Sequence, residues 1–192
     1  MIKIDRPDCP NEASLNSGNY KHKDNKDALI EANSGKCMYC ESQVTHTYYG
    51  DVEHIKPKSK YPDLEFKWSN LGYVCAKCNG AKSDNFEEDT PYVNPYDDEP
   101  SDHIVSSGTM MIPKQGSERG EITILDIGLN RPGLIERRAD RRSKIISTLN
   151  SCYKTTNKRL KDHALNALRK EADNDKEYSL CVRAILEVQE VM

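Results

Sequence analysis

Two Cys-x-x-Cys pairs constrain this fold more than any other feature of the sequence. They are Cys37/Cys40 and Cys75/Cys78, with thirty-four residues between the pairs. Each pair can present two thiolates, and structural zinc sites bind four such ligands in a tetrahedron. The spacing therefore predicts one zinc site that joins the two ends of a long insert. Because four thiolates leave no open coordination position, we expect this zinc to be structural rather than catalytic.

Composition indicates a modest core and a heavily solvated surface. Of 192 residues, 36% are apolar and 31% are charged, which suits one domain, or a small domain with an appendage. No stretch approaches the roughly 20 apolar residues that cross a bilayer, and the N-terminus lacks the apolar segment of a secretory signal. We therefore expect a cytoplasmic protein whose cysteines stay reduced. Three cysteines outside the pairs are expected to be buried or free thiols: Cys9, Cys152 and Cys181.

Charge is segregated along the chain, although the formal net charge is only −3. Residues 87–102 hold seven acids and no Lys or Arg, whereas residues 131–170 hold twelve Lys or Arg and three acids. A basic segment on a mildly acidic protein indicates a polyanion or an acidic partner surface. A solvated helix face is the alternative, and charge alone does not decide between them.

The sequence predicts an α+β fold in three parts. Residues 1–22 are polar, contain Pro and Gly, and are predicted to form an extended N-terminal arm. Residues 23–130 hold both cysteine pairs and form the expected central domain. Residues 131–192 are predicted to be a helical region of two or three helices, because apolar residues recur there at helical spacing. The clearest stripe is Leu160, Ala164, Ala167 and Leu168.

Within the central domain the pattern predicts short elements. A helix is expected over residues 25–34, with Asp24 as its cap. Two short strands are expected around a turn near Gly50. Residues 67–74 are expected to form a loop before the second cysteine pair, and residues 120–130 one further strand.

An acid–His pair, Glu53-His54, lies inside the insert, with Asn70 sixteen residues after His54 and Asn79 directly after Cys78. Taken singly, each has an ordinary interpretation as a surface or turn residue. Taken in order, "CMYC", "EHIKP", "NL" and "CAKCN", followed by a lysine, resemble the cysteine-flanked motif of HNH endonucleases. The resemblance covers about a quarter of the chain.

This resemblance implies a ββα-metal nuclease, with a hairpin packed on a helix, that hydrolyses phosphodiester bonds. It places His54 as the general base that deprotonates water, and Glu53 and Asn79 as ligands of a catalytic divalent ion. Asn70 takes the position that steadies the hairpin and orients the base. Many members carry His at the metal positions, whereas the oxygen donors here favour Mg²⁺ or Mn²⁺. Two lysines are candidate phosphate contacts: Lys82 and Lys58.

Segments outside the motif are similar to one branch of the family, the PtuB-type HNH component of Septu and retron anti-phage systems. These segments are "MIKIDRP", "PKSKYPDLEFKWSNL", "VNPYDDEPSDHI" and "ITILDIGLNRPGLIERR". The resemblance implies a bacterial defence protein that acts with a co-encoded, PtuA-like ATPase subunit. DNA is the default substrate of the family, and RNA stays open.

Two alternatives remain at this stage. A non-catalytic zinc module that recruits nucleic acid or protein would need the cysteines, but would give Glu53, His54 and Asn79 no joint role. A standalone HNH nuclease would keep the motif without an ATPase. The apolar stripes of the helical region must be covered by the nuclease or by a partner. A basic run there could meet an acidic partner or guide nucleic acid: Arg137, Arg138, Arg141 and Arg142.

Overall fold

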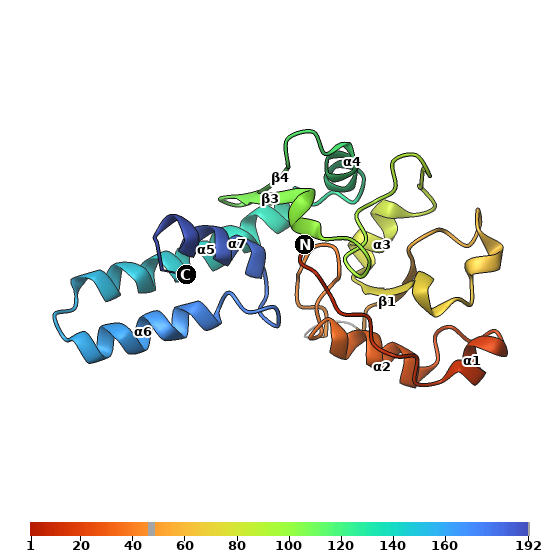
Figure 1. The fold of residues 1–192 in the computed structure, drawn as a ribbon, viewed down its shortest axis with the longest axis horizontal. Helices are drawn as coiled ribbons and strands as arrows, with labels where there is room; N and C mark the ends of the chain where they lie inside the picture. Colours follow the sequence, from red (N-terminus) through yellow and green to blue (C-terminus); the bar gives the residue numbers. More distant parts are fainter. Residues whose placement is uncertain (46–48, 192) are drawn as a thin grey trace.

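The insert between the cysteine pairs folds as an antiparallel hairpin followed by a short helix (Figure 1). In the computed structural model, which describes residues 1–45 and 49–191, strand β1 (Asp51–His54) pairs with β2 (Leu71–Val74). Helix α3 (Ala76–Lys82) follows at once and packs on β1. All four residues of β2 are buried. This ββα unit confirms the predicted core, and the mixed α+β fold class is also confirmed.

The pairing of this hairpin differs from the prediction made around Gly50. The first expected strand falls largely on residues 46–48, which lie outside the described residues. The partner of β1 instead comes from residues 67–74, which were expected to be a loop. A strand buried on both faces has a continuous apolar pattern rather than an alternating one, so a four-residue strand here had no clear signature.

The N-terminal residues 1–22 are not extended throughout, because they contain helix α1 (Glu12–Asn16). Helix α2 (Lys23–Ala32) matches the predicted helix closely. Its cap is His22 rather than Asp24, and the His22 side chain accepts a hydrogen bond from the Asp24 backbone N–H. The helix therefore begins two residues earlier than the sequence suggested.

A second hairpin, β3 (Ile104–Ser107) and β4 (Met110–Pro113), precedes helix α4 (Glu118–Asp126). The strand predicted over residues 120–130 is therefore wrong. Its β-branched residues favour a strand locally, but the Ser117 hydroxyl caps a helix by accepting the Gly120 N–H at 3.1 Å. One face of α4 is buried: Gly120, Thr123 and Ile124.

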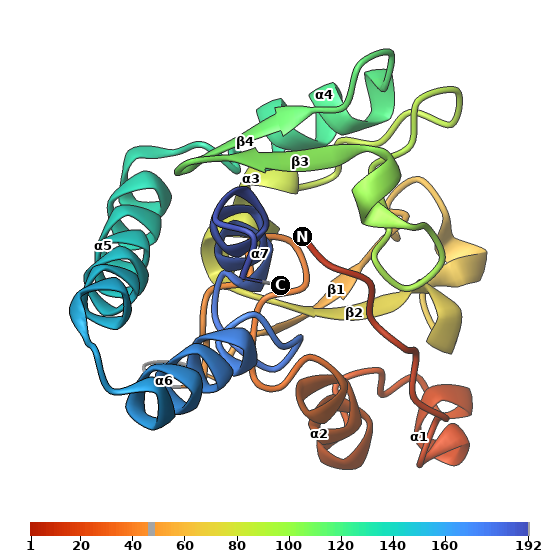
Figure 2. The same cartoon turned by 60° about the vertical axis from the view of Figure 1, so that its left-hand side comes forward.

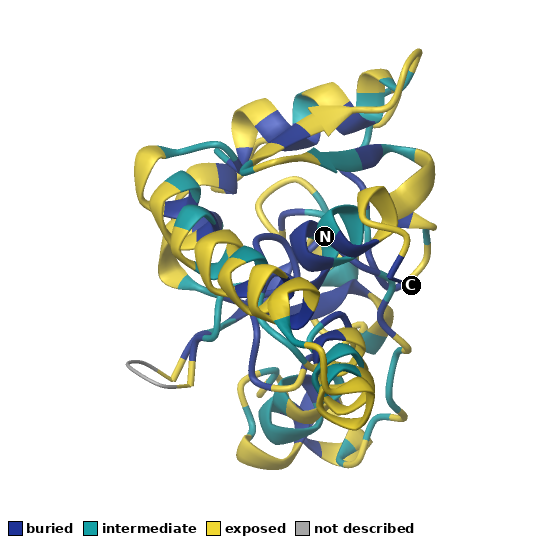
Figure 3. Cartoon of the chain, turned by 90° about the vertical axis from the view of Figure 1, so that its left-hand side faces the viewer, coloured by how far each residue is buried: buried dark blue, intermediate teal, exposed yellow. Residues whose placement is uncertain are grey.

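The C-terminal region is helical, as predicted, with α5 (Pro132–Lys154), α6 (Lys158–Lys170) and α7 (Ser179–Val188). Figures 1 and 2 show α5 and α6 side by side, at the end of the molecule away from α1. Their facing sides form a separate apolar cluster with α7 and with residues that follow α6 and α7: Ile145, Leu149, Cys152, Leu168, Ala172, Val182, Leu186 and Val191. Figure 3 shows that the outward faces are exposed. Within residues 1–45 and 49–191, no helix has the length and apolar character to cross a membrane.

The four arginines of the predicted basic run in α5 do not form one exposed basic surface. Arg138 is buried, and its Nη1 donates to the Leu129 carbonyl at 2.7 Å. Arg141 forms an ion pair with Glu171, which joins α5 to the end of α6. Two of the four arginines therefore hold the helical region together, and the exposed pair is Arg137 and Arg142.

The helical region is joined to the first cysteine pair by buried polar contacts. Glu41 accepts hydrogen bonds from the Ser179 hydroxyl at 3.0 Å and the Leu180 N–H at 3.3 Å. The Ser42 hydroxyl lies 2.8 Å from the Tyr178 hydroxyl. The main core also includes C-terminal residues: Leu134, Tyr178 and Cys181. The proposed three-part division stays a prediction, but the last part packs into the core of the others.

Candidate functional site

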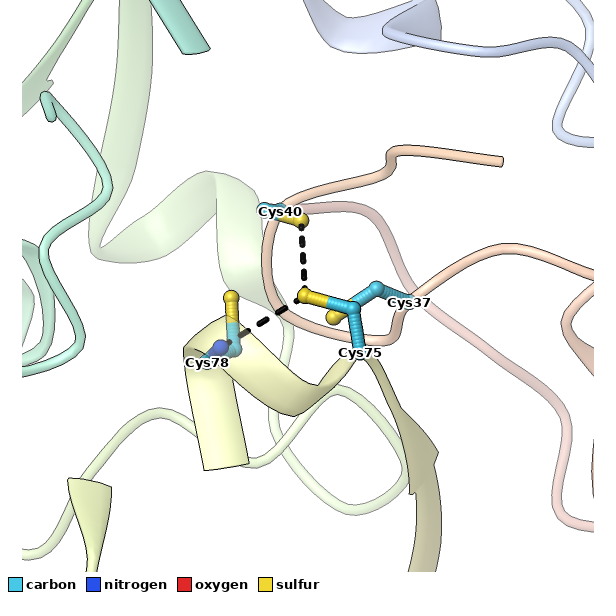
Figure 4. Close-up of side chains that lie close together, drawn as sticks. All are labelled: Cys37, Cys40, Cys75 and Cys78. Carbon is cyan, nitrogen blue, oxygen red and sulfur yellow. Dashed lines mark hydrogen bonds between the residues drawn. The ribbon is translucent and has the colours of Figure 1, made fainter. Parts of the chain in front are cut away.

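Four cysteine thiols converge where the first cysteine pair meets α3 (Figure 4). Their sulfur atoms all lie within 4.8 Å of one another, and Cys40 Sγ is 3.9 Å from Cys75 Sγ. Zinc–sulfur bonds of about 2.3 Å in a tetrahedron place the sulfurs about 3.8 Å apart. The cluster therefore fits a four-coordinate structural metal site. The four residues are Cys37, Cys40, Cys75 and Cys78.

Arg131, at the start of α5, contacts this thiol cluster. Its guanidinium lies 3.5 Å from Cys78 Sγ and 3.9 Å from Cys75 Sγ, and it also donates to the Gly128 carbonyl at 3.1 Å. Four thiolates around Zn²⁺ carry a net charge of −2, which a guanidinium partly offsets. Arg131 had no signal in the sequence, because a contact across fifty-three residues leaves no local pattern.

A second polar group lies between β1 and α3. Asp51 and Glu53 are two residues apart and therefore project from the same face of β1. Asn79 projects from α3 and donates from Nδ2 to Asp51 Oδ2 at 3.1 Å. With His54, these residues line one cavity of about 420 Å³. The structure thus brings together the predicted Glu53, His54 and Asn79. It adds Asp51, which the period-two spacing with Glu53 could have revealed.

Glu53 and Lys82 form a buried ion pair inside this site. Glu53 is 3% exposed, Lys82 is fully buried, and their Oε1 and Nζ atoms are 2.6 Å apart. Burial raises the pKa of Glu53 to about 7, while the Lys82 charge opposes that rise. Lys82 Nζ also donates to the His54 carbonyl at 3.0 Å. The lysine is therefore directed into the site, a placement that does not favour its predicted contact with a phosphate.

Replacing Lys82 by Met is expected to lower the unfolding free energy by about 3 kcal/mol, because it leaves a buried carboxylate without its partner. Adding Glu53→Gln to Lys82→Met should recover most of that loss. Urea unfolding of the wild type, both single variants and the double variant measures the coupling. Additive losses in the double variant would show that the two side chains do not depend on each other.

The His54 ring is held by a backbone contact. Its Nε2 lies 2.9 Å from the Glu65 carbonyl oxygen. Because a carbonyl only accepts, Nε2 carries the proton and Nδ1 remains able to accept one. Burial lowers the pKa of His54, and the hydrogen bond to the Glu65 carbonyl opposes this shift. The positive charges of Lys58 and Lys82 lower the pKa further. The lowered pKa favours the neutral imidazole at neutral pH, the form that a general base requires.

Asn70 closes the loop between β1 and β2. Its Oδ1 accepts the Lys56 N–H at 2.8 Å, and its Nδ2 donates to the carbonyls of Lys56 at 2.9 Å and Leu64 at 3.2 Å. Leu64 directly precedes Glu65, whose carbonyl holds His54. These contacts fit the predicted steadying role of Asn70, which stays a prediction.

Lys58 lies on the same loop and lines the cavity. Its Nζ is paired with Glu65 Oε1 at 2.7 Å, and its side chain is 47% exposed. Unlike Lys82, it is therefore placed where a phosphate could reach it.

A ββα unit flanked by four converging cysteines, with an acid–His pair and an Asn in one cavity, defines an HNH-type domain. Residues 37–85 match the family model described as HNH endonuclease, so the chain contains an HNH domain.

Two curated relatives are similar to this chain. Septu protein PtuB of Bacillus thuringiensis is 36% identical over 117 residues, covering 54% of this chain and 46% of that protein. Septu protein PtuB of Bacillus mycoides (strain KBAB4) is 32% identical over 151 residues, covering 62% and 51%.

The chain spans about half the length of these curated relatives. Both comparisons agree with the resemblance found in the sequence, so the HNH and PtuB-type similarity is confirmed.

Proposed function

We propose that this chain is a metal-dependent HNH endonuclease that hydrolyses phosphodiester bonds in nucleic acid, with DNA as the first substrate to test and RNA as the second. One observation carries the proposal. His54, with Nε2 bonded to the Glu65 carbonyl, shares one cavity with the oxygen donors Asp51, Glu53 and Asn79. A base beside a hard-ion ligand set is what hydrolysis of a phosphodiester needs.

Two kinds of metal site support this proposal. The four thiols suit a structural Zn²⁺, since soft sulfur ligands select it. Two carboxylates and an amide oxygen suit Mg²⁺ or Mn²⁺, with Glu53 and Asn79 as predicted ligands and Asp51 as an added one. Such an ion supplies stabilisation of negative charge on the phosphate and on the leaving 3′ oxygen.

The chain's own residues then handle the proton. Nδ1 of His54 accepts a proton from a water molecule, whose oxygen attacks the phosphorus while the bond to the 3′ oxygen breaks. The Glu65 carbonyl keeps the ring in the required tautomer and can stabilise the imidazolium that forms. Solvent protonates the leaving oxygen, and His54 returns its proton to water.

The test is incubation of the purified, zinc-containing protein with plasmid DNA and with total RNA, in Mg²⁺ or Mn²⁺ and in EDTA. Each arm is run with and without the co-encoded ATPase. Metal-dependent cleavage in either substrate supports the proposal. Nucleic-acid binding with no cleavage in any arm would favour the non-catalytic zinc module. Equal cleavage with and without the ATPase would favour a standalone nuclease.

We further propose that the protein acts in the bacterial cytoplasm as the nuclease subunit of an anti-phage complex with a PtuA-like ATPase. Similarity to Septu protein PtuB supports this partner. Among the described residues of the helical region, the large aliphatic side chains of Leu160 and Val188 are exposed, at 61% and 79%, and are the candidates for coverage by the partner.

Replacing both Leu160 and Val188 by Asp is expected to weaken the complex at least tenfold. An apolar interface should also hold at high salt, whereas an ionic one should not. Deleting the helical region is unsuited to this test, because its residues Leu134 and Tyr178 belong to the main core. The matched control is Leu125→Asp, which changes an exposed leucine on α4. Unchanged affinity of the double variant in low and high salt would place the partner elsewhere.

A further inference from the structure

One wall of the His54 cavity comes from outside the residues that match the HNH family. Tyr20 and Lys21 line this cavity, although the match begins only at residue 37. The Tyr20 and His54 rings meet in a T-shaped arrangement, with centroids 4.6 Å apart and planes at 68°. This is a favoured geometry for two aromatic rings.

Lys58 and Glu65 connect Tyr20 to the other side of the imidazole. Lys58 Nζ lies 5.1 Å from the centre of the Tyr20 ring, within the range of a cation–π contact. The same ammonium is 2.7 Å from Glu65 Oε1, and the Glu65 carbonyl is 2.9 Å from His54 Nε2. His54 is thus held at its Nε2 edge by the backbone and on another side by Tyr20.

The N-terminal segment that carries Tyr20 is itself fixed to the hairpin. Arg6 donates to the carbonyls of Trp68 and Leu71, both at 2.9 Å, and the Trp68 indole N–H donates to the Pro7 carbonyl at 2.7 Å. Tyr20 also packs against Phe66 of the β1–β2 loop, with centroids 6.3 Å apart. The segment therefore has a defined place beside the site rather than behaving as a loose arm.

We infer that Tyr20 is a positioning residue for His54. The phenol ring of Tyr20 fixes the orientation of the His54 imidazole. This inference rests on the proposed nuclease function. His54 has two side-chain torsions, and the hydrogen bond at Nε2 leaves rotation about the direction of that bond. The Tyr20 ring blocks this rotation, so that Nδ1 keeps facing the cavity. An error of about 1 Å in the position of a reacting group can cost about 10²-fold in rate.

The test compares Tyr20→Phe, Tyr20→Leu and Tyr20→Ala with the wild type. Tyr153→Ala, at a half-exposed tyrosine of α5, is the matched control. Loss of the ring, in the Leu and Ala variants, should lower kcat between 10- and 100-fold with KM changed less than about twofold. Tyr20→Phe keeps the ring and should stay within about twofold of the wild type, as should Tyr153→Ala.

A second readout does not need catalysis. Nitrogen-15 NMR of the histidine rings, recorded without added divalent ion, should show His54 as a single Nε2–H tautomer in the wild type and in Tyr20→Phe. Tyr20→Leu should give averaged tautomers and lose the ring-current shift of the His54 ring protons. If the wild type cleaves no substrate but Tyr20→Leu shows these NMR changes relative to the wild type, the nuclease proposal is refuted and the role of Tyr20 in holding His54 stands.

Two results would overturn the role of Tyr20. Unchanged kcat and unchanged His54 resonances in folded Tyr20→Leu would show that the ring does not hold the imidazole. A Tyr20→Phe variant as impaired as Tyr20→Leu would assign the effect to the phenolic hydroxyl, and so to a contact with substrate rather than to positioning.

Discussion

Replacing Cys37 or Cys75 by Ser is expected to leave a chain that does not fold stably and does not retain zinc. The four sulfurs tie the first cysteine pair to α3, and Arg131 extends that connection to α5. Zinc binding to four thiolates contributes about 10–16 kcal/mol, which is at least comparable with the whole stability of a typical domain, about 5–15 kcal/mol. A core with this modest apolar content should not compensate for that loss.

Elemental analysis should find one zinc per chain in the wild type, and circular dichroism should show loss of cooperative unfolding in either Ser variant. Cys9→Ser is the matched control, because Cys9 is only partly buried and lies outside the thiol cluster. It should keep both zinc and fold. Well-folded wild-type protein that contains no zinc would contradict the structural role of the thiols.

Replacing His54 by Ala is expected to reduce cleavage by about 10²- to 10⁴-fold, the usual contribution of a general base. Zinc content and folding should be unchanged, because His54 contacts the Glu65 carbonyl and Tyr20 and no member of the thiol cluster. The matched control is His163→Ala, at an exposed histidine of α6, which should cleave like the wild type. Full activity of His54→Ala would remove the general-base assignment.

The sequence predicted those parts of the site that are encoded locally. Each cysteine pair, the Glu53-His54 pair and Asn79 sit in short motifs, so their identity and order were enough to expect a common site. Asp51 also had a local signal, its period-two spacing from Glu53. Arg131 and Tyr20 had none, because their contacts join segments far apart in the chain.

The burial of charged side chains was harder to predict from the sequence than the residue types that form the site. Lys82 and Arg138 looked like cations for a phosphate or a partner, but both are enclosed and hydrogen-bonded inside the protein. Sequence alone does not show which charged residues a fold will surround. The same limit explains the error at α4, where a capping Ser117 and burial of one helix face outweighed local β propensity.

We propose that a thiolate centre lies apart from a hard-ion site beside His54. The most direct test is Mn²⁺ binding to the zinc-loaded protein, measured by electron paramagnetic resonance. One Mn²⁺ per chain is expected in the wild type and in His54→Ala, because His54 serves as the base and not as a ligand. The ion should be lost when Glu53→Gln and Asn79→Ala are combined. Loss of Mn²⁺ in His54→Ala alone, or wild-type binding in the double variant, would contradict this arrangement.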